Sequence, residues 1–353
     1  MKMKRDPRLD LIRASAMTAV FAVHFFLNSG FYEVQSGGWA MTLGVMVRTQ
    51  LMVCVPLFLI LTGWLQKDRT CSWDYYKGIG SLLVTYVLAS MLCAVFRALF
   101  LDGDWSPVAW MQDLLAFRLA PYGWYIELYL GLFLLLPFLN AAWRGLKNKR
   151  ARQCLVATVV FLSIGPSLNV ISMHFGWKTV LSGWDELYPA AYYFLGCYLR
   201  DYPPRWSRKG LLLTDAAAVL AGGLLHAYQA IGEPFGFFAL TYWNGFFTFL
   251  AAVSVFQLLR SCPFERAPRR VRGAVSLVAS LSLPAFLVSW VPDQIAYGLL
   301  NRLVPTMVQR FPWGLVTVPF VLAGSILLSL GLKGVQRGLR RILSWGRKVT
   351  PSP

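Results

Sequence analysis

Apolar runs separated by short, polar and mostly basic segments recur along the whole chain. Each run is about 20 residues long, the length that an α-helix needs to cross the hydrocarbon core of a bilayer. The pattern therefore predicts an all-α, polytopic integral membrane protein with about ten transmembrane helices. The sixth helix is short and carries Pro189, so we expect it to be tilted, broken or only partly inserted. The expected helices are residues 9–30, 43–66, 77–101, 122–143, 152–172, 186–200, 210–231, 236–260, 274–297 and 313–336.

The composition agrees with a membrane protein and leaves no room for a large soluble domain. Of the 353 residues, 57% are hydrophobic and only 14% are charged, which is rare in a soluble domain. The sequence contains no evident tandem repeat or low-complexity tract. We therefore expect residues 1–353 to form a single transmembrane domain with short basic tails on the cytoplasmic side.

The net charge of +18 is explained by membrane topology rather than by nucleic-acid binding. If the N-terminus is cytoplasmic, 27 of the 34 Lys and Arg residues fall in the inside segments and 4 in the outside loops. Basic residues collect on the cytoplasmic side of membrane proteins, so this alternation predicts an N-in, C-in topology. The basic segments should also attract anionic membrane lipids. The other three basic residues, Arg13, Arg48 and Arg97, lie inside predicted helices.

The cysteines do not indicate a disulfide framework or a metal site. None of the six forms a CxxC pair, and four of them fall inside apolar runs, where a free cysteine behaves as a small apolar residue. We therefore expect no bound metal. HExxH and P-loop patterns are also missing from the sequence, and we expect no bound cofactor. The N-terminal segment resembles a signal peptide but lacks a small-residue cleavage site, so it is expected to remain as the first helix.

The first predicted helix carries a narrow polar stripe. Arg13 and His24 are eleven positions apart, which leaves them about 20° apart around a helix and about 16 Å apart along it. Asp10 lies three residues before Arg13, and Asn28 lies four residues after His24. Ionisable groups inside a membrane usually face an interior cavity and mark function. The alternatives are that Arg13 is a topology anchor and that His24 is a neutral imidazole bonded between helices.

Other polar residues are expected at a depth similar to that of His24. A cluster of arginines, carboxylates, an asparagine and a histidine near the outer face predicts an extracytoplasmic site, in which His24 would accept and return a proton. Either carboxylate could orient His24, or each could serve only as a structural ion-pair partner. These residues are Arg48, Arg97, Glu127, Asn244 and Asp293.

Three segments resemble membrane acyltransferase family 3. The first is "RLDLIRASA" with Arg13 and His24 spaced as in that family's first helix. The second is "VPLFLILTGWL", residues 55–65, and the third is "WYIELYLGLFLLLPFLN", residues 124–140. The length, the helix count and the predicted orientation are also similar to those of the family. A later segment, "SLPAFLVSWVP", departs from the family pattern, with Ser289 where a histidine is usual.

The resemblance implies an integral membrane O-acyltransferase. Such an enzyme moves an acyl group, usually acetyl, from cytoplasmic acyl-CoA to a hydroxyl of a cell-surface carbohydrate or its lipid-linked precursor. Carried over by position, Arg13, with Asp10 beside it, would help bind the donor or hold the acyl path, and His24 would be the essential base or acyl relay. Phe58 and Gly63 would shape the second segment. The enzyme would lie in the plasma (inner) membrane of a bacterial cell.

Chemistry agrees with these roles. Coenzyme A is a polyanion, arginine pairs well with phosphate, and a hydroxyl needs a base to attack a thioester. Trp124 and Tyr125 near the outer face could stack on sugar rings, or they could belong to the aromatic belt of a membrane protein. The main rival interpretation is a transporter or flippase of a lipid-linked glycan, and a third is a non-catalytic partner in glycan synthesis. The sequence leaves the oligomeric state open.

Overall fold

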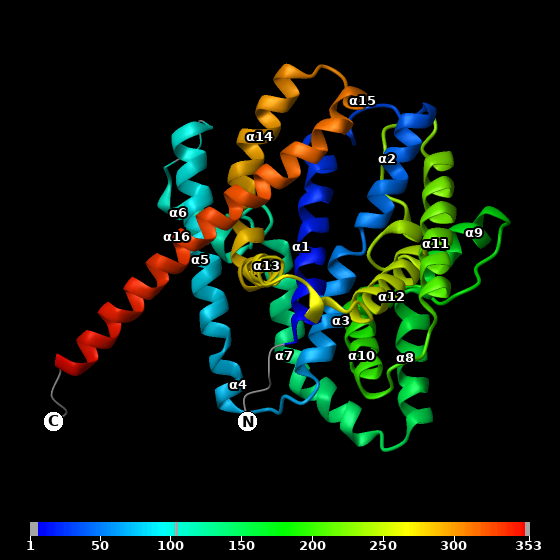
Figure 1. Ribbon diagram of the computed structural model, residues 1–353, viewed down its shortest axis with the longest axis horizontal. Coiled ribbons are helices and arrows are strands. Elements are labelled where there is room, and N and C mark those ends of the chain that lie inside the picture. The colour runs from blue at the N-terminus through cyan, green and yellow to red at the C-terminus, as the bar shows by residue number, and fades with distance from the viewer. Residues whose placement is uncertain (1–5, 102, 104, 350–353) are drawn as a thin grey trace.

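The computed structural model describes residues 6–101, 103 and 105–349, and most of this chain is helical (Figure 1). The described residues form isolated β-bridges but no β-strand, which confirms the all-α prediction. The α-helices are α1 (Pro7–Asn28), α2 (Gly38–Leu51), α3 (Cys54–Gln66), α4 (Trp73–Lys77), α5 (Ile79–Phe100), α6 (Pro107–Leu115), α7 (Trp124–Gly145), α8 (Lys149–Ser163), α9 (Asn169–His174), α10 (Tyr188–Asp201), α11 (Arg208–Gln229), α12 (Phe246–Arg260), α13 (Arg269–Val288), α14 (Trp290–Leu303), α15 (Met307–Arg310) and α16 (Gly314–Val349). The 3-10 helices are η1 (Gly165–Leu168), η2 (Asp185–Leu187), η3 (Ala239–Thr241), η4 (Phe264–Arg266) and η5 (Phe311–Trp313).

Several of these helices can cross a membrane, as expected for a multi-pass membrane protein. Eight candidate spans occur among the described residues, or nine if α8 and α9, which are bent by 43°, form one span. The expected sixth span corresponds to α10, whose 14 residues reach only about 21 Å and fall short of a bilayer core. The expected ninth span, residues 274–297, is divided between α13 and α14 at Ser289. The count of about ten therefore stays a prediction.

Local sequence signals explain where several helices begin and break. Asp6 accepts a hydrogen bond from the backbone N–H of Arg8, and Pro7 occupies the first turn of α1, where its missing N–H is tolerated. Between α2 and α3, Met52 interrupts the helix. Pro56 follows four residues later and has no N–H to donate to the carbonyl of Met52. The interruption therefore falls where one helical backbone hydrogen bond cannot form.

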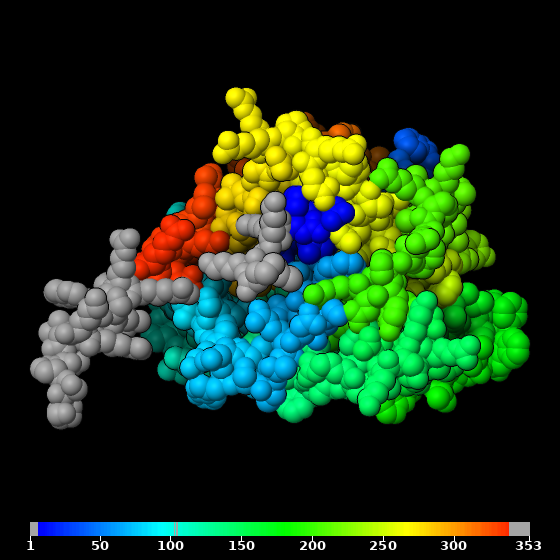
Figure 2. All heavy atoms as spheres, turned by 60° about the horizontal axis from the view of Figure 1, so that its bottom comes forward, coloured from blue at the N-terminus to red at the C-terminus, as the bar shows by residue number. Residues whose placement is uncertain are grey.

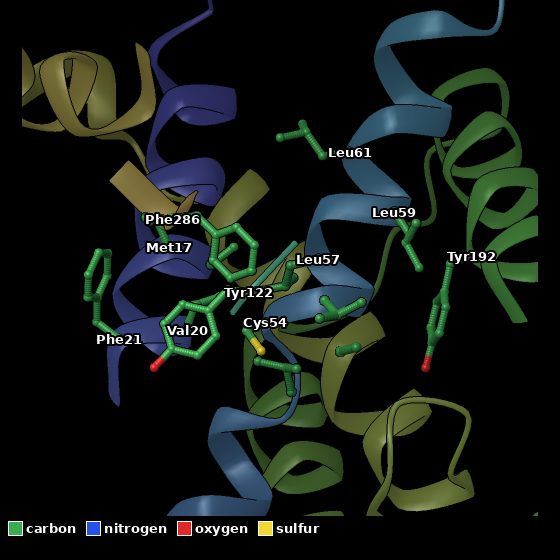
Figure 3. Close-up of a cluster of buried hydrophobic side chains, with 14 of the residues drawn as sticks. Met17, Val20, Phe21, Cys54, Leu57, Leu59, Leu61, Tyr122, Tyr192 and Phe286 are labelled. Atoms are coloured by element: carbon green, nitrogen blue, oxygen red, sulfur yellow. The ribbon is translucent and has the colours of Figure 1, made fainter. Parts of the chain in front are cut away.

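Helix α1 lies inside the bundle and provides much of its core. It packs against α3, α12, α13, α14 and α16 (Figure 1). Met17 and Val20 of α1 belong to one buried apolar cluster with Leu57 of α3 and Phe286 of α13 (Figure 3). In a membrane such contacts stabilise the bundle through close packing, because lipid is as apolar as the side chains. The polar residues of α1 are thus held on a central helix that is packed on several sides.

One end of the bundle, which we call the basic end, gathers the basic segments. Lys67 and Arg152 pair with Asp201, and Arg260 pairs with Asp6 at the start of α1. Burial alone would raise the pKa of Asp201, but hydrogen bonds from Lys67 and the charge of Arg152 lower it below its usual value. Figure 2 looks onto this side of the molecule, where the start of α1 lies between the yellow α12–α13 region and the light-blue α3–α4 region. The basic segments are residues 67–77, 144–152, 200–209 and 260–272.

Helices α3 and α10 cross at two glycines. A Cβ added to Gly63 would lie 1.9 Å from the backbone oxygen of Tyr193, and one added to Gly196 would lie 2.1 Å from that of Ile60. Two backbones can approach this closely only where neither carries a side chain. Gly63 therefore shapes its segment by packing against α10.

Candidate active site

A cavity of about 390 Å³ lies against α1 and is lined by residues of α3, α5, α7 and α13. Its walls are mostly apolar, and both Arg13 and His24 contribute to its lining. Gln66, the last residue of α3, lines it near the basic end, and Trp124, the first residue of α7, lines it near the opposite end. The polar face of α1 thus borders an interior space, as membrane-embedded ionisable groups usually do.

His24 is the centre of a buried polar group at the end of the cavity opposite the basic end. Its side chain is buried, and its Nδ1 lies 3.2 Å from Oδ2 of Asp293, which is 1% exposed. The same carboxylate oxygen accepts a hydrogen bond of 2.7 Å from the hydroxyl of Tyr122. Asn28 donates to that hydroxyl at 3.2 Å. Four polar side chains therefore interact where a lipid-facing helix would carry none.

The contact between His24 and Asp293 is close but is not a straight hydrogen bond. The separation of 3.2 Å is within reach, but the imidazole is not aligned to point its Nδ1–H at the oxygen. Such contacts often tighten only when substrate binds. Because Nδ1 faces the carboxylate, Nε2 is the nitrogen left for chemistry in the cavity.

Two interruptions of the helical structure bring Tyr122 and Asp293 to His24. Tyr122 lies in a tight turn before α7, where a Cβ on Gly123 would lie 2.3 Å from the backbone oxygen of Phe117, a residue with a φ of 55°. Asp293 lies in the first turn of α14, which begins anew after α13 ends, and its N–H donates to the carbonyl of Ser289 at 2.9 Å. A continuous helix through Ser289 would aim Asp293 elsewhere, since each residue turns the side chain by about 100°.

Arg13 lies on the same helix, nearer the basic end. Its Nη1 is 3.8 Å from Oδ1 of Asp10, one turn earlier on α1. Tyr125 and Tyr129 of α7 line the same cavity as Arg13. Asp10 and Arg13 therefore lie together, as the spacing predicts.

The aromatic residues at the far end also line the cavity. Trp124 stacks on Trp243 with ring centres 4.6 Å apart and planes 13° apart. Tyr125 packs edge-on against Phe286 at 5.7 Å and lies 6.2 Å from Phe58. These rings form a wall of the cavity close to His24, so Phe58, Trp124 and Tyr125 lie where they could contact a substrate.

The two other membrane-embedded arginines lie away from this site. Arg48 is buried, and its Nε donates to the hydroxyl of Tyr32 at 2.6 Å while its guanidinium lies 5.0 Å from the ring centre of Phe235. Arg97 lies 5.2 Å from the ring centre of Trp290. The contacts of the two guanidinium groups with Phe235 and Trp290 are cation–π interactions. Neither arginine lines the cavity.

Glu127 and Asn244 are not brought to His24 either. Glu127 is exposed on the first turn of α7. Asn244 lies in the turn before α12, beside Trp243, which does line the cavity. Of the two carboxylates that could orient His24, only Asp293 is in contact with it.

Sequence reasoning did not identify Tyr122 as part of the site. It stands in "APYGWY", directly before the segment that resembles the family, and a tyrosine at that depth is typical of an aromatic belt. Cys54 and Tyr129 also line the cavity and carried no signal. Within the described part of the chain, no three His, Cys, Asp or Glu side chains lie close enough to hold a metal ion.

The chain matches a known protein family. A family model described as an acyltransferase domain matches residues 6–330, which is most of the chain. No curated protein and no solved structure matches it.

Proposed function

The chain belongs to membrane acyltransferase family 3 and is an acyltransferase. We propose that it transfers an acyl group, most simply acetyl, from cytoplasmic acyl-CoA. The acceptor is a hydroxyl of a cell-surface carbohydrate or of its lipid-linked precursor. The observation that carries this proposal is a single cavity bordered by Arg13 towards the basic end and by the His24–Asp293 pair towards the other. Donor and acceptor can then meet inside the bundle without exposing a charge to lipid.

The donor enters from the basic end. Coenzyme A is a polyanion, and the basic segments together with an N-in, C-in topology would keep positive charge on the side where acyl-CoA exists. Arg13, about 16 Å from His24 along α1, can hold a polar part of the donor within the cavity. The apolar walls between Arg13 and His24 suit an extended part of the donor that carries few charges.

His24 acts as the base. Nε2 accepts the proton of the acceptor hydroxyl while the hydroxyl oxygen attacks the thioester carbonyl carbon. The new C–O bond forms, the C–S bond breaks, and the departing thiolate takes the proton back from the imidazolium, so the free thiol and the ester are the products. Asp293 stabilises the transient imidazolium and fixes Nδ1 as the protonated nitrogen.

The acceptor occupies the other end of the cavity. Trp124 and Tyr125 offer aromatic faces there, and such faces stack on the apolar faces of sugar rings. This supports a carbohydrate acceptor. We place the enzyme in the plasma (inner) membrane of a bacterial cell, and the acceptor in its envelope, because the family resemblance implies it. No bound cofactor is needed, because acyl-CoA is the donor substrate.

The test is thiol release from acetyl-CoA by the purified protein in lipid nanodiscs, with and without a preparation of surface glycan. We expect release of coenzyme A that depends on the glycan, and a matching gain of acetyl on the glycan by mass spectrometry. A flippase would move the glycan and release no thiol. If the glycan gains acetyl groups while acetyl-CoA stays intact, the assignment of acyl-CoA as the donor is wrong.

A further inference from the structure

Tyr122 contacts both members of the proposed catalytic pair. Its hydroxyl donates to Oδ2 of Asp293 at 2.7 Å, and its ring lies 4.0 Å from the imidazole of His24, centre to centre, with 34° between the planes. We propose that Tyr122 is a positioning residue that holds the carboxylate of Asp293 and the imidazole of His24 in the arrangement that proton transfer requires. The proposal rests on the proposed function, because it assigns Tyr122 a role in that same reaction.

The hydrogen bond determines which way the carboxylate faces. Oδ2 of Asp293 receives the Tyr122 hydroxyl and also lies 3.2 Å from Nδ1 of His24. Oδ1 is buried and has no hydrogen-bond partner in the described part of the chain. Without the Tyr122 hydroxyl, neither oxygen of the Asp293 carboxylate would accept a hydrogen bond from a described side chain, so the carboxylate could rotate away from the imidazole.

Tyr122 is itself held from two sides. Asn28 donates to its hydroxyl at 3.2 Å, so the phenol proton is directed towards Asp293 rather than towards Asn28. The backbone is fixed by the tight turn at Gly123, whose N–H donates to the carbonyl of Ala120 at 2.8 Å. A side chain with a fixed backbone and a directed hydroxyl is suited to positioning its neighbours.

The first experiment compares Tyr122→Phe with Tyr193→Phe in the nanodisc assay. Tyr193 is an equally buried tyrosine that donates to Oδ1 of Asn140 at 2.5 Å and does not line the cavity. We expect Tyr122→Phe to lower kcat by about 10- to 100-fold with little change in KM, as for a lost hydrogen bond to a charged group. Tyr193→Phe should keep kcat within about twofold per folded molecule.

A double-mutant cycle then separates positioning from general structure. In an Asp293→Asn background, Tyr122→Phe should lower kcat by at most a further twofold, because Tyr122 acts through the carboxylate. Fluorotyrosine at position 122 keeps the shape and the hydrogen-bond donor, so it should fold normally and keep kcat within about twofold of the wild type, in contrast to Tyr122→Phe. If the wild type transfers no acyl group, the proposed function fails. If the wild type is active but the losses in kcat multiply in the cycle, or Tyr122→Phe lowers kcat no more than Tyr193→Phe does, Tyr122 has no positioning role.

Discussion

The crossing of α3 and α10 gives a prediction whose size can be worked out from the structure. Replacing Gly63 by alanine would place a methyl group 1.9 Å from the backbone oxygen of Tyr193, whereas ordinary contact begins near 3.4 Å. The helices must therefore separate locally by about 1.5 Å, the difference between these distances. Cys197, whose Sγ lies 3.4 Å from the oxygen of Gly63, would also lose its contact. Overpacking of this kind costs about 1–3 kcal/mol.

The assay is thermal unfolding in detergent, followed by the fraction that remains monodisperse on size exclusion. We expect Gly63→Ala and Gly196→Ala each to lower the midpoint by several degrees. Gly131→Ala is the matched control, because Gly131 lies within α7 and an added Cβ would meet nothing within 4 Å. An unfolding midpoint for Gly63→Ala equal to that of Gly131→Ala would show that the close crossing does not exist in the folded protein.

Three further predictions concern the site and the topology. Arg13→Ala should raise the apparent KM for acyl-CoA by about 10- to 100-fold, and Arg13→Lys should raise it less, since lysine keeps the charge but not the bidentate geometry; unchanged donor dependence in both would leave Arg13 as a topology anchor. Asp293→Asn should lower kcat by about 10²- to 10⁴-fold while Glu127→Gln stays within about twofold, measured in the same assay, and equal losses would contradict the assignment of Asp293. In a background without other cysteines, Cys262 should resist an impermeant maleimide in intact cells, whereas a cysteine at Lys178 should react; ready labelling at 262 would overturn the N-in, C-in topology.

The features that could be predicted from the sequence are those set by local periodicity. The polar stripe of α1 follows from helix geometry alone, so Arg13 and His24 could be assigned to one face before any tertiary contact was known. The all-helical fold follows from apolar runs that cannot cross lipid in any other open form. The family was identified from the resemblance of three segments to membrane acyltransferase family 3, and the match over residues 6–330 confirms it.

The features that could not be predicted depend on where the helices break and cross. A periodic apolar run gives no sign that the chain restarts its helix at Ser289, yet this break aims Asp293 at His24. Depth along the membrane placed Glu127 and Asp293 together, but their direction around a helix decides contact, and Glu127 faces outwards. Tyr122 was missed for the same reason, since its role depends on a turn rather than on a helix face.

The central claim is that His24 is the base, and substitution of His24 tests it most directly. Activity should be measured per correctly folded molecule for His24→Ala and His24→Gln. We expect both to lose about 10²- to 10⁴-fold in kcat while keeping the folded yield, because an amide holds hydrogen bonds but cannot accept a proton at neutral pH. A structural histidine would give the opposite pattern, with Gln tolerated and Ala unstable, and near-wild-type transfer by His24→Gln would remove His24 from the mechanism.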